Sequence, residues 1–100
     1  VEELEQFAPA DPGNRIGRDY IRFTVNDRPG VLAEITAAMR DAEVSIESLI
    51  QRGRDHAGGE VLVAMVTHEG PERCVTKALD LLNGSPSLTA APLVMPILGD

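Results

Sequence analysis

The chain has 100 residues, a net charge of −7, 43% apolar residues and a mean hydropathy close to zero. This length suits one small domain with a modest core. No apolar run approaches the roughly 20 residues that span a bilayer, so no membrane partner is expected. The acidic balance, with two Phe, one Tyr and no Trp, argues against a nucleic-acid partner, which requires cations and aromatic stacking surfaces.

Residues 1–18 have the composition of a linker. After a stretch that can form a short helix, with Leu4 and Phe7 on one face, the run Ala8-Pro9-Ala10-Asp11-Pro12-Gly13-Asn14 breaks regular structure. We therefore expect residues 1–18 to join a preceding domain and residues 19–98 to form the folded unit.

A strand followed by a helix comes next. Residues 20–25 are expected to form the strand, because Ile21, Phe23 and Val25 alternate with other residues and share one side. Residues 29–42 are expected to form the helix, with Pro29 at the first helical position. Its apolar stripe consists of Val31, Leu32, Ile35, Met39 and Ala42. No glycine ends this helix, so the left-handed position falls near Glu43, at a cost of roughly 1 kcal/mol.

Residues 44–68 are predicted to form a β-hairpin. Residues 44–51 are expected to form a strand in which Val44, Ile46, Ser48 and Ile50 share one side unless a bulge intervenes. Residues 52–59 form a polar, Gly-rich loop. Residues 60–68 form a third strand that is apolar on both faces, which is typical of a central strand.

A second helix is expected to begin at Gly70-Pro71-Glu72, again with proline at the first helical position, and to end at Gly84. Its buried stripe consists of Cys74, Val75, Ala78, Leu79 and Leu82. Residues 88–98 supply the last strand, and its two prolines confine it to a sheet edge because each removes a ladder donor.

This order predicts an α+β fold of the ferredoxin-like βαββαβ type, a four-stranded antiparallel sheet with two helices on one face. The first and third strands are then central, and the second and fourth are edges. The second strand has no proline and is free to pair with another copy. The two-sided apolar third strand also leaves apolar surface on the helix-free face, so both features predict association.

The turn before the first helix is the candidate ligand site. Gly30 leaves the backbone N–H groups of the first turn open, and these groups with the helix dipole favour a carboxylate. Asn26 or Asp27 can accept a hydrogen bond from an ammonium group. The alternatives are that the motif is only a helix start and that Asp27 is a helix cap. Arg28 is read as a solvent-facing charge or a carboxylate ligand.

No catalytic or metal constellation is visible in the sequence. His56 and His68 stand apart from other ligands, and Ser45 and Ser48 lack a paired base. The chain has no Gly-rich nucleotide-binding motif, so no cofactor is expected in it. Cys74 excludes an internal disulfide framework and fits a reducing compartment, so a cytoplasmic location is expected.

Two stretches resemble a known family. Residues 20–35, Tyr-Ile-Arg-Phe-Thr-Val-Asn-Asp-Arg-Pro-Gly-Val-Leu-Ala-Glu-Ile, look like the opening of an ACT domain, and residues 44–51, Val-Ser-Ile-Glu-Ser-Leu-Ile-Gln, look like its second strand. More narrowly, residues 45–48 and 65–69 and the Pro-containing last strand resemble the C-terminal ACT domains of homoserine dehydrogenases. ACT domains are ferredoxin-like modules that bind amino acids and regulate the enzymes to which they are attached.

The resemblance implies a regulatory segment, itself without catalytic activity, of an NAD(P)-dependent homoserine dehydrogenase. Threonine is the expected ligand, acting in feedback inhibition of threonine, methionine and isoleucine biosynthesis. In this family two domains often pair through their second strands, with the ligand between the first loop of one copy and the second strand of the other. The matching positions are Asn26, Asp27 and the amides of Gly30, Val31 and Leu32 in the loop, and Ile46, Ser48 and Ile50 in the partner strand.

Two alternatives stay open. One is a ligand-free dimerisation module. The other is an ACT domain of a different host, such as a serine-pathway dehydrogenase or a nucleotide alarmone synthetase.

Overall fold

The computed structural model describes residues 16–53 and 60–98. Most of the predicted linker and most of the predicted hairpin loop therefore lie outside the described residues. The elements are β1 (Ile16–Asn26), α2 (Val31–Asp41), β2 (Ile46–Arg52), β3 (Glu60–Thr67), β4 (Gly70–Pro71), α3 (Glu72–Leu82) and β5 (Leu93–Ile97). Neither described helix is long and apolar enough to cross a bilayer.

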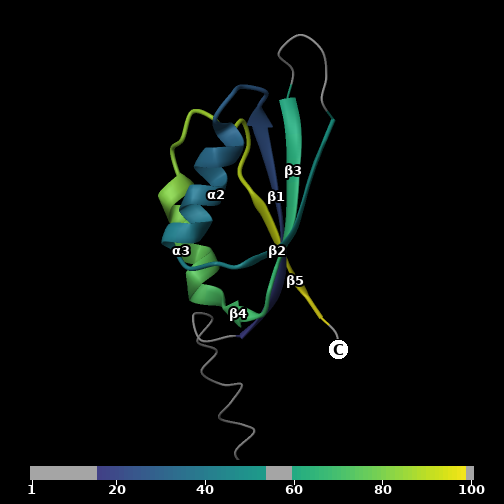
Figure 1. Cartoon of the computed structure of the whole chain (residues 1–100), viewed down its shortest axis with the longest axis vertical. Coiled ribbons are helices and arrows are strands. Elements are labelled where there is room, and N and C mark those ends of the chain that lie inside the picture. The colour runs from purple at the N-terminus through teal and green to yellow at the C-terminus, as the bar shows by residue number, and fades with distance from the viewer. Residues whose placement is uncertain (1–15, 54–59, 99–100) are drawn as a thin grey trace, which may run out of the picture.

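The sheet has the predicted ferredoxin-like order. Its strands run β2-β3-β1, and both β5 and the two-residue β4 pair with the remaining edge of β1, all of them antiparallel. Figure 1 shows α2 and α3 together on one face of the sheet. The predicted central positions of β1 and β3 and the edge positions of β2 and β5 are confirmed, and β4 is the one addition among the described strands.

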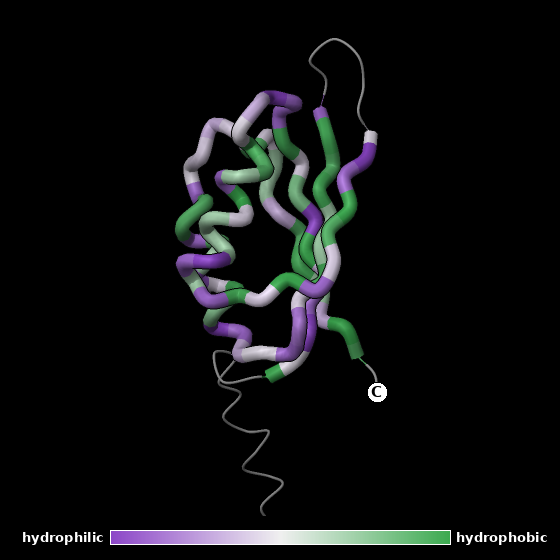
Figure 2. Tube along the Cα trace, in the orientation of Figure 1, coloured by the Kyte–Doolittle hydropathy of each residue, from purple (hydrophilic) through white to green (hydrophobic). Residues whose placement is uncertain are grey.

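The core lies between the helices and the inner face of the sheet. Ile21, Phe23 and Val25 of β1 are buried, as the alternation predicts. The other buried apolar residues are Val31, Ile35, Ala38, Met39, Ala42, Val61, Val63, Met65, Val75, Ala78 and Leu82. Figure 2 shows the apolar residues concentrated along the central strands, with hydrophilic residues on the outer side of the helices. Burial of this shared apolar surface stabilises the two-layer fold.

Both proline positions differ from the prediction. The first helix begins at Val31, because Gly30 is its N-cap with a left-handed φ of 89° and cannot continue a helix. Pro29 therefore lies in the preceding turn. Pro71 is the N-cap of α3, with an extended ψ of 137°, and it pairs with Ile16 of β1. In both helices the proline precedes the first helical residue.

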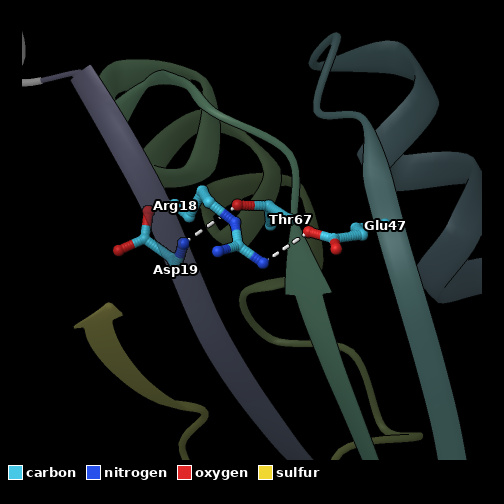
Figure 3. A network of polar contacts seen from close by, with 4 residues as sticks. All are labelled: Arg18, Asp19, Glu47 and Thr67. Atoms are coloured by element: carbon cyan, nitrogen blue, oxygen red, sulfur yellow. Dashed lines mark hydrogen bonds and ion pairs between the residues drawn. The ribbon is translucent and has the colours of Figure 1, made fainter. Parts of the chain in front are cut away.

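The first strand is longer than its apolar pattern and the last strand is shorter. β1 begins at Ile16, inside the segment predicted as linker, and its start is tied to its neighbours by polar contacts (Figure 3). The Asp19 N–H donates a 3.0 Å hydrogen bond to Thr67 Oγ1, and Arg18 forms a 2.6 Å ion pair with Glu47. At the other end of the chain, β5 begins only at Leu93, and Leu88 forms an isolated bridge with Val25.

Glu43 adopts the predicted left-handed conformation, with φ 65°. Its N–H donates to the Arg40 carbonyl at 3.0 Å, and the Val44 N–H donates to the Met39 carbonyl at 2.8 Å. These two hydrogen bonds form a Schellman motif, in which the C-terminal carbonyls of the helix are satisfied by a left-handed residue. The motif turns the chain from α2 towards β2.

A bulge in β2 separates side chains that the alternation groups together. Ile46 pairs with Thr67, but Ser48 pairs with Val66, so one extra residue lies between them. Thr67 is buried towards the helices, so Ile46 lies on the helix-covered face. Ser48 and Ile50 lie on the opposite face, which no described helix covers. The bulge that the sequence analysis allowed for is therefore present, and Ile46 does not share a side with Ser48 and Ile50.

Candidate ligand-binding site

The turn between β1 and α2 is exposed and shaped by Gly30. Residues 27–30 are exposed and Asn26 is half-buried. The Arg28 N–H donates to the Asn26 carbonyl at 3.0 Å, and the first helical hydrogen bond runs from the Glu34 N–H to the Gly30 carbonyl at 2.9 Å. A Cβ added to Gly30 would meet nothing within 4 Å, so glycine is required here for its left-handed φ and not for space.

The helix start presents its N–H groups without a side-chain cap. No described side chain caps the N-terminus of α2, and the Val31 N–H makes only a long 3.4 Å hydrogen bond to the Arg28 carbonyl. The alternative in which Asp27 caps the helix is therefore wrong. First-turn N–H groups and the positive end of the helix dipole favour an anion. The side chain of Val31 is buried, so Val31 can offer a ligand only its backbone.

Asn26 is held in place by a loop that sequence reasoning did not connect to it. Its backbone N–H donates to the Ser87 carbonyl at 2.9 Å, and its Nδ2 donates to the Pro86 carbonyl at 3.0 Å. The side-chain amide is thereby oriented, and its Oδ1 remains as an acceptor for a ligand. Neither Pro86 nor Ser87 was among the predicted site residues, and only the run Gly84-Ser85-Pro86-Ser87 marks this loop as a turn.

A carboxylate in the first turn of α2 joins the same loop. Glu34 accepts hydrogen bonds from Ser85 Oγ at 2.6 Å and from Ser87 Oγ at 2.8 Å. Arg28 Nη2 donates to Ser87 Oγ at 3.4 Å. The hydrogen bonds from Ser85 and Ser87 lower the pKa of the Glu34 carboxyl below its usual 4.5; burial opposes this in part, and the charge of Arg28 makes the smallest contribution to the lowering.

The predicted strand half of the site lies far from the loop in a single chain. Asn26 is in register with Glu60 of β3, and Ser48 is in register with Val66. These β3 positions are six residues apart, which corresponds to about 20 Å along the sheet. One copy therefore does not bring the predicted site residues together.

The outer edge of β2 is the place where a second copy can pair. Among the described strands, β2 pairs only with β3. Most of its residues, including Ser48 and Ile50, are exposed. An unpaired strand edge of this kind presents backbone donors and acceptors to another chain.

Sequence comparison identifies the family. The family model described as "ACT domain" matches residues 20–80. The chain belongs to the ACT domain family. That match includes most of β1, the turn before α2, β2 and β3, so the predicted recognition and the ferredoxin-like fold are confirmed together.

Curated relatives of this ACT domain are homoserine dehydrogenases. That of Methylobacillus glycogenes is 27% identical over 70 residues, which are 70% of this chain and 17% of the relative. That of Neisseria gonorrhoeae is 36% identical over 61 residues, covering 60% of this chain and 14% of the relative. The chain thus spans about a fifth or less of the length of the curated relatives it matches.

Solved structures show the same fold. A homoserine dehydrogenase from Thiobacillus denitrificans matches with a TM-score of 0.74 at 24% identity, covering 85% of this chain and 18% of that one. The ACT domain from GTP pyrophosphokinase of Chlorobium tepidum matches with a TM-score of 0.61 at 16% identity, covering 83% of this chain and all of that one.

A hollow elsewhere on the ACT domain contains none of the predicted site residues. It measures about 480 Å³ and lies between the end of α3 and the segment leading to β5. Within residues 16–53 and 60–98, no three His, Cys, Asp or Glu side chains are grouped so that they could hold a metal ion. The helix start and the β2 edge therefore remain the candidate site.

Proposed function

We propose that this ACT domain is the regulatory segment of a homoserine dehydrogenase and that it binds threonine for feedback inhibition of threonine, methionine and isoleucine biosynthesis. Support comes from the curated relatives, which are homoserine dehydrogenases that this chain matches over 14–17% of their length. In this proposal the rest of the longer polypeptide carries the oxidoreductase activity. NAD(P) binding is likewise assigned to the rest of that polypeptide, since this chain itself has no Gly-rich dinucleotide motif.

The chemistry of the helix start suits a free amino acid. The ligand carboxylate accepts hydrogen bonds from the backbone N–H groups at Gly30, Val31 and Leu32, where the helix dipole adds to the attraction. The ligand ammonium group donates to Asn26 Oδ1, whose orientation is held by the 3.0 Å hydrogen bond to Pro86, or to the exposed Asp27 carboxylate.

The observation that carries the proposal is the separation of the two halves of the site. The helix-start loop and Ser48 are about 20 Å apart in one chain, and among the described strands β2 pairs along one edge only. Two copies paired through β2 place the loop of one beside the strand of the other. Threonine bound at this seam contacts both copies, so it stabilises one relative arrangement over others. This difference in affinity is what an allosteric effect requires.

A ligand-free dimerisation module is the second candidate. The same β2 edge favours it, because strand pairing alone can hold two catalytic subunits together. This candidate differs from the first in one respect, since it predicts dimerisation without any amino-acid binding.

Isothermal titration with L-threonine, combined with a measurement of mass in solution, separates the two candidates. We expect saturable binding to a dimer, weaker or absent binding of serine, isoleucine, lysine and methionine, and loss of threonine binding in Asn26→Ala. Thr36→Ala is a matched control, since its hydroxyl bonds only to carbonyls of its own helix. A folded dimer that binds no amino acid would favour the assembly role instead.

A further inference from the structure

The face of the sheet opposite the helices contains a hollow, and Ile50 is the one proposed amino-acid site residue that lines it. It measures about 330 Å³ and is lined by Tyr20 and Arg22 of β1, Leu62 and Ala64 of β3, and Ile50 and Arg52 of β2. In the strand register, Ala64 lies between Arg22 and Ile50. The small side chain of Ala64 therefore leaves a depression between longer neighbours, with an apolar floor.

Exposed apolar side chains also lie on the same face at the far edge of the sheet. Met95 pairs with Tyr20, and Leu93 pairs with Arg22, so both lie on the helix-free face. Leu93, Met95 and Ile50 are 39%, 47% and 55% exposed. Exposed apolar side chains gathered on one face, with charged side chains among them, are typical of a site of interaction with another surface.

The charges at the hollow are positive although the chain is acidic. Arg22 and Arg52 lie on β1 and β2, two strands apart, so their backbones are separated by about 10 Å across the sheet. Neither arginine forms an ion pair with a described residue. On the same face, Glu47 is already engaged by Arg18 at 2.6 Å (Figure 3). Two guanidinium groups without an ion pair to a described residue therefore flank an apolar floor in a chain of net charge −7.

We infer that this face is a docking surface for an acidic polypeptide segment with an apolar anchor side chain. The anchor fills the depression over Ala64, and carboxylates beside it pair with Arg22 and Arg52, a geometry for which guanidinium groups are well suited. The source of the segment rests on the proposed function, in which this domain is part of a homoserine dehydrogenase; the curated relatives are several times longer than this chain and have ample sequence to supply it.

Other occupants fit the face less well. A second copy stacked by two-fold symmetry would present the same two arginines, and like charges oppose that contact. A nucleic acid has no apolar side chain to fill the depression over Ala64, and two cations are too few to follow a phosphate backbone. The two arginines beside an apolar depression thus favour a segment that combines carboxylates with an apolar side chain.

The test uses a short fluorescent peptide in which a Phe-Leu pair is flanked on both sides by Glu. Binding is measured as the rise in the fluorescence anisotropy of the peptide when the chain is added. We expect saturable binding that weakens with added salt. In the double variant Arg22→Glu, Arg52→Glu, binding should fall by about tenfold or more, because both charge-assisted contacts to the peptide are lost and replaced by repulsion. Arg40→Glu, on the exposed side of α2, is the matched control and should bind as the unchanged chain does.

Three results would overturn the inference. The first is no binding of the acidic peptide, and the second is equal binding to the double variant. The third is equal binding of a peptide in which Lys replaces each Glu. Circular dichroism verifies that the double variant is folded. If the double variant does not fold, the single variants Arg22→Gln and Arg52→Gln are tested in its place. Threonine titration of the same variants shows whether the amino-acid site is independent of this face.

Discussion

Ser85 and Glu34 lie 51 residues apart in the sequence and are joined by a 2.6 Å hydrogen bond from Ser85 Oγ to Glu34 Oε2. Ser87 Oγ donates to the other oxygen of the same carboxylate at 2.8 Å. These contacts bind the first turn of α2 to the loop after α3, and the hydrogen bond from Asn26 to Pro86 binds the end of β1 to the same loop. The turn that presents the candidate ligand site is therefore supported from both of its ends.

The lowered pKa of Glu34 makes this support sensitive to acid. Because the folded-state pKa lies below the unfolded value near 4.5, its contribution to stability is present above that value and is lost as the pH falls through the folded pKa. We expect Glu34→Gln to flatten the dependence of the melting temperature on pH between roughly pH 6 and pH 3. The effect should be well under about 1 kcal/mol, since the carboxylate is exposed and solvent screens it.

The double variant Ser85→Ala, Ser87→Ala is the control for this mechanism. It removes the two donors and keeps the carboxylate, so it should flatten the same part of the pH profile. A pH profile unchanged in both variants would show that these hydrogen bonds do not lower the pKa of Glu34.

Glu43→Gly should raise the free energy of unfolding by about 0.5–1 kcal/mol, because glycine adopts a left-handed backbone without a steric cost. Glu43 has φ 65° and closes the Schellman motif of α2. Gly84→Ala is the reciprocal control. Its φ is 86° and an added Cβ would meet nothing within 4 Å, so it should lose a similar amount through backbone strain alone. Urea denaturation of both variants measures the two changes, and a clear loss of stability in Glu43→Gly would contradict the assignment.

Proline substitutions at two adjacent positions of β2 test the proposed pairing of copies. In an antiparallel strand, successive N–H groups point to opposite sides, so one of Ile50→Pro and Gln51→Pro removes a donor to β3 and the other removes a donor on the free edge. We expect the variant that loses the donor to β3 to be destabilised. The variant that loses the donor on the outer edge should fold as a monomer, as measured by light scattering. If the stable variant of the two stays dimeric, the copies do not pair through β2.

Much of this fold is predictable from local patterns. The alternation of Ile21, Phe23 and Val25 identifies the buried face of β1, and the two-sided apolar β3 is central as expected. The alternation of apolar residues does not predict the start of β1 at Ile16, because the first residues of this strand are mostly polar or glycine. One of these polar residues, Asp19, is nevertheless buried. Burial of a polar residue depends on its cross-strand neighbours, which a single strand does not reveal.

The candidate site is predictable only in part, for a similar reason. Asn26 and the Gly30 turn are local features of one segment, so the sequence of that segment is enough to predict them. The bulge between Ile46 and Ser48 is a property of the register with β3, so β2 alone does not show it. The contacts of Glu34 with Ser85 and Ser87 join residues more than 50 positions apart, and no local periodicity links them.

Mixing two defective variants tests most directly whether one amino-acid site is shared by two copies. Asn26→Ala removes the loop half, and Ser48→Glu adds a repelling carboxylate to the strand half. Neither variant alone should bind threonine. Random mixing should restore about a quarter of the original sites, because half of the dimers are mixed and each holds one intact site. Verified mixed dimers without binding, or full binding by Ser48→Glu alone, would contradict the shared site.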